Sequence, residues 1–182
     1  MKLTIVTSNA HKVKEISEFF GGTVEVSHVA LDIPEYRSDD VKRIAEGKAR
    51  FAFDALRIPV VVDDTAFSVN ALNGFPGPYA AYALHTIGYE GILRLMEGEA
   101  ERCARFTTAI AYADKSCVKV FSGTIEGTIA RGPRGCEGFG YDPIFQYGET
   151  TLAELPLAEK SRVSHRAKAL SLFRDWFRAR NG

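Results

Sequence analysis

A turn rich in hydroxyl, amide and basic side chains follows the first apolar run of the chain, where residues 7–15 read TSNAHKVKE. If residues 9–20 are helical, the first turn offers unpaired backbone N–H groups and the positive end of the helix dipole, which suit a phosphate. Because successive side chains advance by about 100° around the axis, Lys12 lies near the flank of the buried face and can reach the same anion. The alternative is that Ser8 or Asn9 simply caps a surface helix, and this pattern alone favours the cap.

Two adjacent carboxylates provide a second candidate, since Asp63 and Asp64 are placed at the end of the buried apolar run 58–62. Side chains alternate across a strand, so only one of the two is expected to face a given pocket. A carboxylate at this position can hold Mg²⁺ alongside a substrate phosphate, or can orient an attacking water. Turn or cap chemistry after the strand is an equally open interpretation. Glu35, a lone acid in a proline-containing loop, carries little information by itself.

Two aromatic side chains in a glycine-rich loop provide a third candidate, because Phe139 and Tyr141 stand among glycines in the stretch GFGYDPIF. Such a loop presents flat apolar rings on which a base can stack. A hairpin loop with two core aromatics is an equally open alternative. Asp142 precedes a proline, so its backbone is expected to be extended.

The last candidate is a cluster of polar and basic side chains at a predicted helix start, formed by Lys160, Ser164, His165 and Arg166. Helix starts favour anions, and His or Arg side chains can donate hydrogen bonds to a carbonyl on a base. The alternative, which this stretch alone favours, is a solvated basic first turn. Neither Ser8 nor Ser164 has the motif context of a Ser-His-Asp nucleophile, and zinc-ligand spacing is absent from the sequence.

Composition limits the class of protein. The 182 residues are predicted to form one domain over residues 1–182, with 46% hydrophobic and 25% charged side chains. The 23 basic and 23 acidic residues cancel, which argues against a broad nucleic-acid-binding surface but allows a local anion pocket. Three cysteines at wide spacings fit a reducing compartment, and no apolar run approaches the ~20 residues that cross a bilayer. We therefore expect a cytoplasmic protein that binds neither membranes nor nucleic acid.

Intermixed strand and helix patterns predict an α/β fold with a mixed, twisted sheet and flanking helices. Apolar runs predict strands over residues 2–8, 23–29, 58–69, 105–114 and 117–130, and helical periodicity predicts helices over residues 9–20, 38–56, 89–98 and 161–180. Loops are expected over residues 73–78 and 131–140, followed by a short extended piece over residues 141–145. In the last helix, Ala167, Leu170, Phe173 and Phe177 are predicted to face inward.

The order of these candidates along the chain is more informative than any one of them. The pattern T-x-N-x-x-K-x-x-E over residues 7–15 matches the opening motif of the inosine triphosphate pyrophosphatase (Ham1-like) family. GFPGPY after DDT, then PRG followed by GFGYDPIF, then a lysine followed by SHR-x-K-A-L resemble the remaining motifs of that family in the same order. The resemblance covers essentially the whole chain and favours the functional interpretation of each candidate.

This resemblance implies an elongated mixed α/β fold with two lobes and a central cleft, usually in a homodimer. It implies hydrolysis of the non-standard purine nucleoside triphosphates ITP, dITP and XTP to a monophosphate and pyrophosphate, with Mg²⁺ or, as a substitute, Mn²⁺. By position it implies triphosphate binding by Thr7, Ser8, Asn9, Ala10, His11 and Lys12, and metal binding by Glu35 and Asp64, with Asp64 also the proton acceptor for the attacking water. It further implies substrate contacts from Thr65 and Lys160, nucleoside binding by Phe139, Gly140, Tyr141 and Asp142, purine recognition by His165 and Arg166, and, by a looser match, a phosphate-facing Lys48.

The chain also departs from the family pattern. DDTAF stands where DDSGL is common, so Thr65 keeps a hydroxyl while the following glycine is lost, and Ala80 stands where a serine is common. Cys136 and Glu137 replace small residues in the glycine-rich loop and bring an acid close to the expected nucleotide pocket. These differences bear on loop flexibility and substrate ranking rather than on the reaction.

Two functions of other classes fit parts of the same pattern. A nucleotide sensor can keep such a fold without turnover. The retention of both Asp63 and Asp64, together with Lys12 and Glu35, argues against this loss. A single-stranded nucleic-acid module can use Phe139 and Tyr141 as stacking platforms, but the balanced charge and the absence of an extended basic track argue against it. Hydrolysis of a nucleoside triphosphate is therefore the leading prediction.

Overall fold

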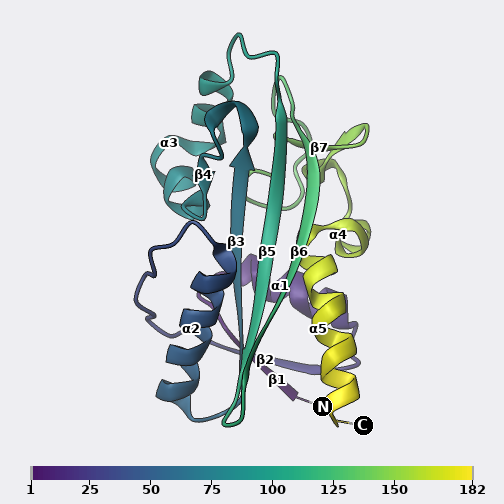
Figure 1. The fold of residues 1–182 in the computed structure, drawn as a ribbon. Helices are drawn as coiled ribbons and strands as arrows, with labels where there is room; N and C mark the ends of the chain where they lie inside the picture. Colours follow the sequence, from purple (N-terminus) through teal and green to yellow (C-terminus); the bar gives the residue numbers. More distant parts are fainter. Residues whose placement is uncertain (1, 182) are drawn as a thin grey trace.

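The structure is a computed structural model that describes residues 2–181 (Figure 1). Its strands are β1 (Lys2–Val6), β2 (Glu25–Val29), β3 (Val60–Val69), β4 (Pro76–Gly77), β5 (Cys103–Ala113), β6 (Val118–Ile129), β7 (Phe145–Tyr147) and β8 (Thr150–Thr151). Its α-helices are α1 (Ala10–Phe20), α2 (Val41–Leu56), α3 (Ala80–Leu95), α4 (Leu157–Val163) and α5 (His165–Asn181), and short 3-10 helices span Asn70–Leu72 and Leu152–Glu154. The predicted α/β class is confirmed.

All the strands of the described residues join in one mixed sheet. The strand order is β2-β1-β3-β5-β6-β7-β8, and β4 pairs with β3 outside this path. Strand β1 runs parallel to both β2 and β3, whereas the other pairs are antiparallel. The long strands β3, β5 and β6 form the spine of the molecule in Figure 1. The predicted mixed, twisted sheet is therefore confirmed.

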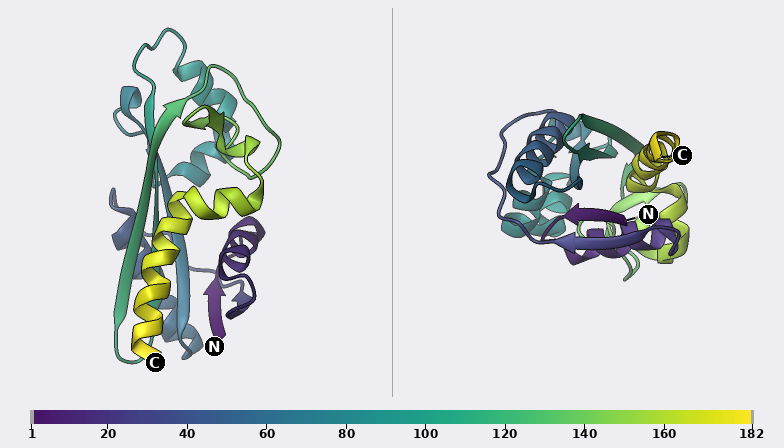
Figure 2. Two further views of the ribbon diagram at one scale, coloured as in Figure 1. Left: turned by 90° about the vertical axis from the view of Figure 1, so that its right-hand side faces the viewer. Right: turned by 90° about the horizontal axis from the view of Figure 1, so that it is seen from below.

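Alternation of side chains along the central strands divides the core between two faces of the sheet. Val60 and Val62 pack in a cluster with α2, whereas Val61 between them packs with α1 and α5. Strand β5 repeats this arrangement, since Ala111 belongs to the α2 cluster and Ile110 to the other. Helices α2 and α5 accordingly lie on opposite sides of the long strands in the view from below (Figure 2). Each fully buried Val or Ile side chain in these clusters contributes about 1.5–3 kcal/mol.

A third apolar cluster surrounds the other end of the long strands. Phe67, Phe106 and Ile125 of β3, β5 and β6 pack there against Ile92 of α3 and against Tyr141. Figure 1 shows α3, β4 and β7 around this upper part, and α1, α2, α5, β1 and β2 around the lower part. We call these parts the upper and lower lobes.

The structure corrects one interpretation and one helix boundary in the middle of the chain. The strand predicted over residues 58–69 is confirmed, so Asp63 and Asp64 lie in mid-strand and the interpretation of a turn after the apolar run is wrong. Strand β5 pairs with β3 along its whole length, which keeps β3 extended past the two carboxylates. The helix predicted over residues 89–98 is only the second half of α3, which begins at Ala80 and is kinked at Gly88, where φ is 67°.

Two further predictions are wrong near the C-terminal end. Residues 141–145 are not a single extended piece, because the N–H groups of Ile144 and Phe145 bond back to the carbonyl of Tyr141 in a turn before β7. The helix predicted over residues 161–180 is interrupted at Ser164, whose ψ of 160° leaves the helical region. The Ser164 hydroxyl accepts a hydrogen bond from the N–H of Ala167 and so caps α5. The inward face predicted for the rest of this helix is confirmed.

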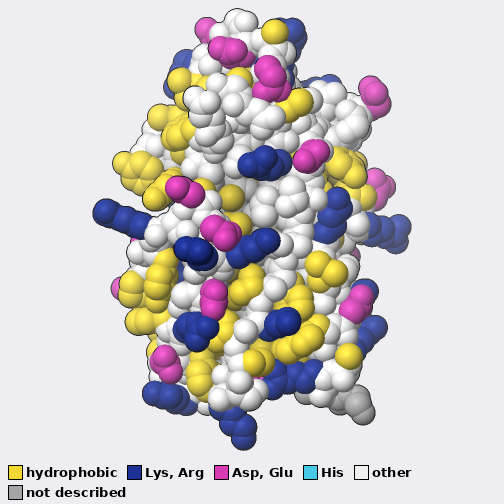
Figure 3. All heavy atoms as spheres, viewed as in Figure 1, with side chains coloured by type: hydrophobic (Ala, Val, Ile, Leu, Met, Phe, Trp, Pro, Cys, Tyr) yellow, Lys and Arg dark blue, Asp and Glu magenta, His cyan; other side chains and the backbone are white. Residues whose placement is uncertain are grey.

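The surface agrees with the even charge balance of the sequence. On the face shown in Figure 3, Lys and Arg side chains are interspersed with acidic ones. Within residues 2–181, none of the helices combines the length and the hydrophobicity that crossing a bilayer requires. The three cysteines are free thiols.

Candidate active site

A cleft between the two lobes contains two adjoining pockets. The first, which we call the aromatic pocket, has a volume of about 430 Å³ and is lined by Phe106, Phe139, Tyr141, His165 and Arg166 among others. The second, which we call the β1–α1 pocket, has a volume of about 520 Å³ and is lined by residues 6–9 and by acidic and basic side chains. The two pockets share the lining residues Asn9, Lys12, Glu35, Lys48, Asp64, Ala81 and His85.

The start of α1 enters the cleft with its cap in place. The Asn9 side-chain oxygen accepts hydrogen bonds from the N–H groups of His11 (2.9 Å) and Lys12 (3.4 Å), so the capping interpretation is confirmed. Asn9 also lines both pockets, so capping and a position in the cleft are compatible. The Lys12 ammonium lies 2.7 Å from the Asp63 carboxylate and donates to the Asp63 carbonyl at 2.8 Å. His11 is exposed, and its ring stacks on Phe139 with centroids 5.0 Å apart.

The alternation of side chains along β3 separates the two adjacent carboxylates. Asp63 points to the side of α1 and α5, where it contacts Lys12 and Arg166. Asp64 points to the side of α2, where its Oδ2 lies 2.9 Å from Nζ of Lys48. Only Asp64 lines the aromatic pocket, but both carboxylates line the β1–α1 pocket. The prediction of one carboxylate per pocket therefore holds for the aromatic pocket alone.

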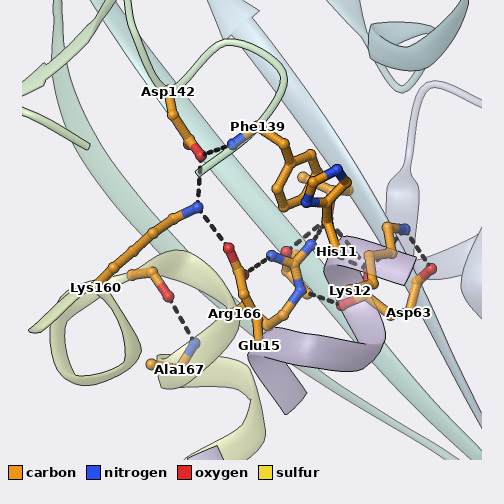
Figure 4. Close-up of polar contacts among 12 residues, drawn as sticks. His11, Lys12, Glu15, Asp63, Phe139, Asp142, Lys160, Arg166 and Ala167 are labelled. Atoms are coloured by element: carbon orange, nitrogen blue, oxygen red, sulfur yellow. Dashed lines mark hydrogen bonds and ion pairs between the residues drawn. The ribbon is translucent and has the colours of Figure 1, made fainter. Parts of the chain in front are cut away.

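Six charged side chains of alternating sign form a continuous chain that begins at Lys12 and ends at the loop carrying Phe139 (Figure 4). In order they are Lys12, Asp63, Arg166, Glu15, Lys160 and Asp142. Asp63 accepts from Arg166 Nε at 2.8 Å, and Glu15 contacts Arg166 Nη1. The Lys160 ammonium lies 2.5 Å from Glu15 and 2.6 Å from Asp142. These contacts, which we call the charge chain, tie α1, β3, α4 and α5 to the loop.

The loop end of the charge chain supports the Phe139 ring. Asp142 Oδ2 accepts a hydrogen bond from the Phe139 N–H at 2.7 Å. A Cβ atom at Gly138 would lie 2.2 Å from the same oxygen, and φ there is 75°, so this close approach requires glycine. Lys160 Nζ lies 5.0 Å from the centroid of the Phe139 ring and Arg166 Cζ lies 5.8 Å from it, both within cation–π range.

The two aromatic side chains of the loop differ in accessibility. Tyr141 is buried, stacks on Phe67 with centroids 4.4 Å apart, and donates from its hydroxyl to the carbonyl of Ala80 at 2.9 Å. Phe139 is only partly buried. Phe139 therefore presents its ring to the cleft, while Tyr141 anchors the loop to the start of α3.

Lys160, His165 and Arg166 of the predicted basic cluster are not solvated, so the interpretation as a basic surface turn is wrong. Lys160, His165 and Arg166 are each only 2–3% exposed. Glu15, for which no separate role was predicted, is 6% exposed and joins Lys160 to Arg166. Glu15 lies three residues after Lys12, on an adjacent part of the helix surface. That spacing was the signal in the sequence that could have pointed to Glu15. Its partners Lys160 and Arg166 could not be found in this way, because they are 145 and 151 residues away in the chain.

Burial and neighbouring charges act in opposite directions on the acids of the charge chain. Burial by itself raises the pKa of Asp63, but the charges of Arg166 and Lys12 outweigh it and hold that pKa well below its usual value. Burial also raises the pKa of Glu15, and Arg166 with Lys160 again reverses the direction, so the pKa is lowered. For Asp142 burial prevails over Lys160 and the pKa is raised. Asp63 and Glu15 are therefore firmly ionised at neutral pH.

His165 is held in its neutral form inside the aromatic pocket. Burial first, and then the charges of Arg166 and Lys160, lower the pKa of His165 well below 6.5. Its ring stacks on Phe106 with centroids 4.5 Å apart. Its Nδ1 atom is buried and has no hydrogen-bond partner among residues 2–181. A neutral imidazole has one donor and one acceptor nitrogen, so His165 can offer either to a polar molecule in this pocket.

Thr65 links the charge chain to β5. Its hydroxyl accepts a hydrogen bond from Arg166 Nη2 at 3.2 Å and lies 2.7 Å from the hydroxyl of Thr108. The Thr65 hydroxyl, which is retained in the DDTAF stretch of this chain, is therefore held by hydrogen bonds to two protein side chains.

Lys48 lies between the two carboxylates predicted to bind metal. Its ammonium is 2.9 Å from Asp64 and 3.3 Å from Glu35, whose side chain is exposed. Burial lowers the pKa of Lys48, but Asp64 and Glu35 outweigh it and the pKa is raised. Among the described residues, no group of three or more His, Cys, Asp or Glu side chains is placed to hold a metal ion. Two carboxylate oxygens nevertheless fit Mg²⁺ when phosphate and water complete its coordination.

Comparison with known proteins identifies the family of this chain. The family model described as Ham1 family matches residues 3–176. The chain belongs to the Ham1 family. It is 46% identical over 184 residues to a dITP/XTP pyrophosphatase of Methanopyrus kandleri, which covers 98% of this chain and 97% of the relative. It is 42% identical over 181 residues to a dITP/XTP pyrophosphatase of Thermococcus kodakarensis, with 98% of each covered.

Solved structures agree with this membership. The structure of the Staphylococcus aureus Ham1 protein matches with a TM-score of 0.86 and 31% identity, over 99% of this chain and 100% of that chain. A dITP/XTP pyrophosphatase from Mycobacterium abscessus matches with a TM-score of 0.71 and 32% identity, over 95% and 98% of the two chains. The predicted resemblance to the Ham1-like family is confirmed.

The cleft of this Ham1-family chain gathers nearly all the residues that the resemblance assigned to a site. Every one of them except Ala10 lines at least one of the two pockets, as does Lys48. Ala80 lines the aromatic pocket, whereas Cys136 and Glu137 line neither. Four residues that line the aromatic pocket were not predicted from the sequence: Ala81, Leu84, His85 and Phe106. These four carry no distinctive chemical pattern in the sequence, and the fold alone brings them to the cleft.

Proposed function

We propose that this chain hydrolyses non-standard purine nucleoside triphosphates, namely ITP, dITP and XTP, to the nucleoside monophosphate and pyrophosphate. The names of the Methanopyrus and Thermococcus relatives support this substrate class. The single observation that carries the reaction is the position of Asp64, a carboxylate at the junction of an aromatic pocket with a pocket rich in charged side chains. A base in the first pocket and a polyphosphate in the second bring the α-phosphate to Asp64.

Binding of the triphosphate in this proposal uses the lower lobe. Lys12 and Lys48 line both pockets, and residues 7–9 at the start of α1 line the β1–α1 pocket. Both ammonium groups already face carboxylates, so a phosphate replaces or shares existing charge partners. A helix start and two lysines can balance much of the charge of a triphosphate without a net-basic protein.

Asp64 is the proton acceptor for the attacking water in this proposal. Water attacks the α-phosphorus, the bond to the β-phosphate oxygen breaks, and pyrophosphate leaves while the proton moves to the carboxylate. Asp64 and Glu35 would hold Mg²⁺, or Mn²⁺ as a substitute, and the ion would supply charge neutralisation of the phosphates. Lys48, which lies between the two carboxylates, would give up part of its contact to that ion.

Recognition of the purine in this proposal falls to His165 in the aromatic pocket, with Phe139 stacking on the base. ITP and XTP carry a 6-carbonyl where ATP carries an amino group. A neutral His165 that donates a hydrogen bond to this carbonyl favours ITP. When ATP is bound, the same donor faces an amino group and stays unpaired, which costs about 1–3 kcal/mol of binding free energy. Arg166 lines the same pocket, but its Nε, Nη1 and Nη2 atoms all donate to protein oxygens. Arg166 therefore supports the pocket and contributes its remaining N–H to recognition.

The experiment that tests the function is incubation of the protein with Mg²⁺ and separate ITP, XTP, dITP, GTP and ATP, with pyrophosphate and orthophosphate measured independently. We expect pyrophosphate from ITP, XTP and dITP. Orthophosphate as the first product, or no turnover of any triphosphate, would overturn the proposal.

Asp64→Asn provides the matching variant. It should reduce turnover by about 10³-fold or more while ITP still binds, because the amide cannot accept the proton. Asp54→Asn, which changes an exposed acid of α2, is the control and should keep full activity. Turnover by Asp64→Asn close to that of the control would move the catalytic role to another group.

The remaining expectations belong to the same proposal. We propose a homodimer in the cytoplasm, where a nucleotide-pool enzyme meets its substrates. Sedimentation velocity at micromolar protein concentration tests the dimer, and a single species with the mass of one 20.0 kDa chain would contradict it.

A further inference from the structure

The junction of the two pockets has two sides that come from different lobes. On the lower-lobe side the shared lining residues are Asn9, Lys12, Glu35, Lys48 and Asp64. On the upper-lobe side they are Ala81 and His85, both on α3. A ligand that fills both pockets therefore passes between these two residues and the lower lobe.

Of the described residues that line both pockets, His85 is the only polar one on the upper-lobe side. Ala81 and His85 are four residues apart on α3, so they share one face of the helix and this face borders the cleft. The imidazole is exposed, and no hydrogen bond, ion pair or ring contact to it is found within residues 2–181. By contrast, Lys12, Lys48 and Asp64 across the junction are engaged in ion pairs. His85 is thus a polar side chain without a protein partner at the junction of the two pockets.

We propose that His85 donates a hydrogen bond to the α-phosphate of the bound nucleotide, and so closes the reacting centre from the α3 side. This inference rests on the proposed function, because it takes the base to lie in the aromatic pocket and the polyphosphate in the β1–α1 pocket. The group of such a ligand that lies at the junction is the α-phosphate. An imidazole carries at least one N–H donor in either protonation state, so the contact does not depend on its charge.

The test separates the α-phosphate from its neighbours by using fragments of the nucleotide. IMP contains the base, ribose and α-phosphate, inosine lacks every phosphate, and pyrophosphate occupies only the far part of the site. Binding of each is measured by calorimetry in the presence of Mg²⁺, for the unchanged protein and for His85→Ala, His85→Gln and Thr86→Ala. Thr86 follows His85 on α3, is exposed and lines neither pocket, so Thr86→Ala is the matched control.

We expect His85→Ala to weaken IMP binding by about tenfold or more, since a hydrogen bond to a charged group is worth at least that factor. Inosine and pyrophosphate should bind as they do to the unchanged protein, and the glutamine variant, which keeps an N–H donor, should recover part of the loss. Alanine is a strong helix former and the site is exposed, so the melting temperature should not fall.

Unchanged IMP affinity in His85→Ala would overturn the proposal. A loss of inosine affinity equal to that of IMP would also overturn it, because His85 would then contact the nucleoside. An equal loss in Thr86→Ala would assign the effect to the helix rather than to the imidazole. Failure of the proposed function is read separately, from the absence of pyrophosphate release by the unchanged protein. If the unchanged protein binds none of IMP, inosine and pyrophosphate, the proposed role of His85 is also overturned.

Discussion

Replacement of Lys160 by methionine is the most direct test of the charge chain. The Lys160 side chain is 2% exposed, and its ammonium lies 2.5 Å from Glu15 and 2.6 Å from Asp142. After the substitution Glu15 still has Arg166, but Asp142 keeps only the Phe139 N–H as a donor. Breaking a buried pair by removal of one partner costs about 3–5 kcal/mol. This is a large part of the roughly 5–15 kcal/mol that separates a folded domain from its unfolded state.

A double-mutant cycle that combines Lys160→Met with Asp142→Asn measures the interaction free energy between Lys160 and Asp142. Asp142→Asn alone leaves Lys160 with Glu15 as its partner, so we expect a cost of about 1–2 kcal/mol. In the double variant no carboxylate is left without a cation, and Lys12, Asp63, Arg166 and Glu15 still alternate in sign. The double variant should therefore be more stable than the sum of the single effects predicts, by about 2–3 kcal/mol.

The assay is urea unfolding at pH 7 without nucleotide, followed by circular dichroism, with the slope against urea checked for constancy. Lys115→Met, at an exposed position of the β5–β6 turn, is the control and should change the free energy of unfolding by no more than about 0.5 kcal/mol. Additivity of the two single variants within about 0.5 kcal/mol would refute the reasoning. So would a Lys160→Met variant as stable as the control.

Two further predictions concern protonation and metal. The pKa of His165 is lowered from 6.5, so below that pH the unfolded chain takes up a proton that the folded chain does not. The stability that this group contributes is therefore present above pH 6.5 and is lost as the pH falls below it. The loss amounts to at most about 1.4 kcal/mol per pH unit. Urea unfolding between pH 7.5 and 5 should show this slope, and His165→Asn should reduce it; an identical slope in both proteins would contradict a neutral His165. Lys48→Met removes the ammonium between Asp64 and Glu35, so Mn²⁺ binding without nucleotide, measured by electron paramagnetic resonance, should become tighter. Weaker Mn²⁺ binding in Lys48→Met would show that the two carboxylates do not form the ion site.

Much of the fold could be predicted from the sequence because its local signals are strong. The cap at Asn9, the amphipathic face of α2 and the alternation at Val60–Val62 are properties of short segments, and the structure confirms them. The boundary errors arose where a single residue changes the backbone. Gly88 kinks α3 and Ser164 separates α4 from α5, and neither effect is visible in an average of apolar spacing.

The candidate site was likewise predicted in part from the sequence and decided in part by the tertiary structure. The order of its motifs along the chain predicted the family, and the alternation of β3 predicted that Asp63 and Asp64 point apart. The sequence by itself thus determined which residue types are present and which local elements carry them. Only the tertiary structure decided which of them meet: Glu15 finds Lys160 and Arg166 from the far end of the chain, and His85 reaches the junction of the two pockets. The physical reason is that a buried charge is stable only with a partner, and that partner is supplied by packing between distant elements rather than by local sequence.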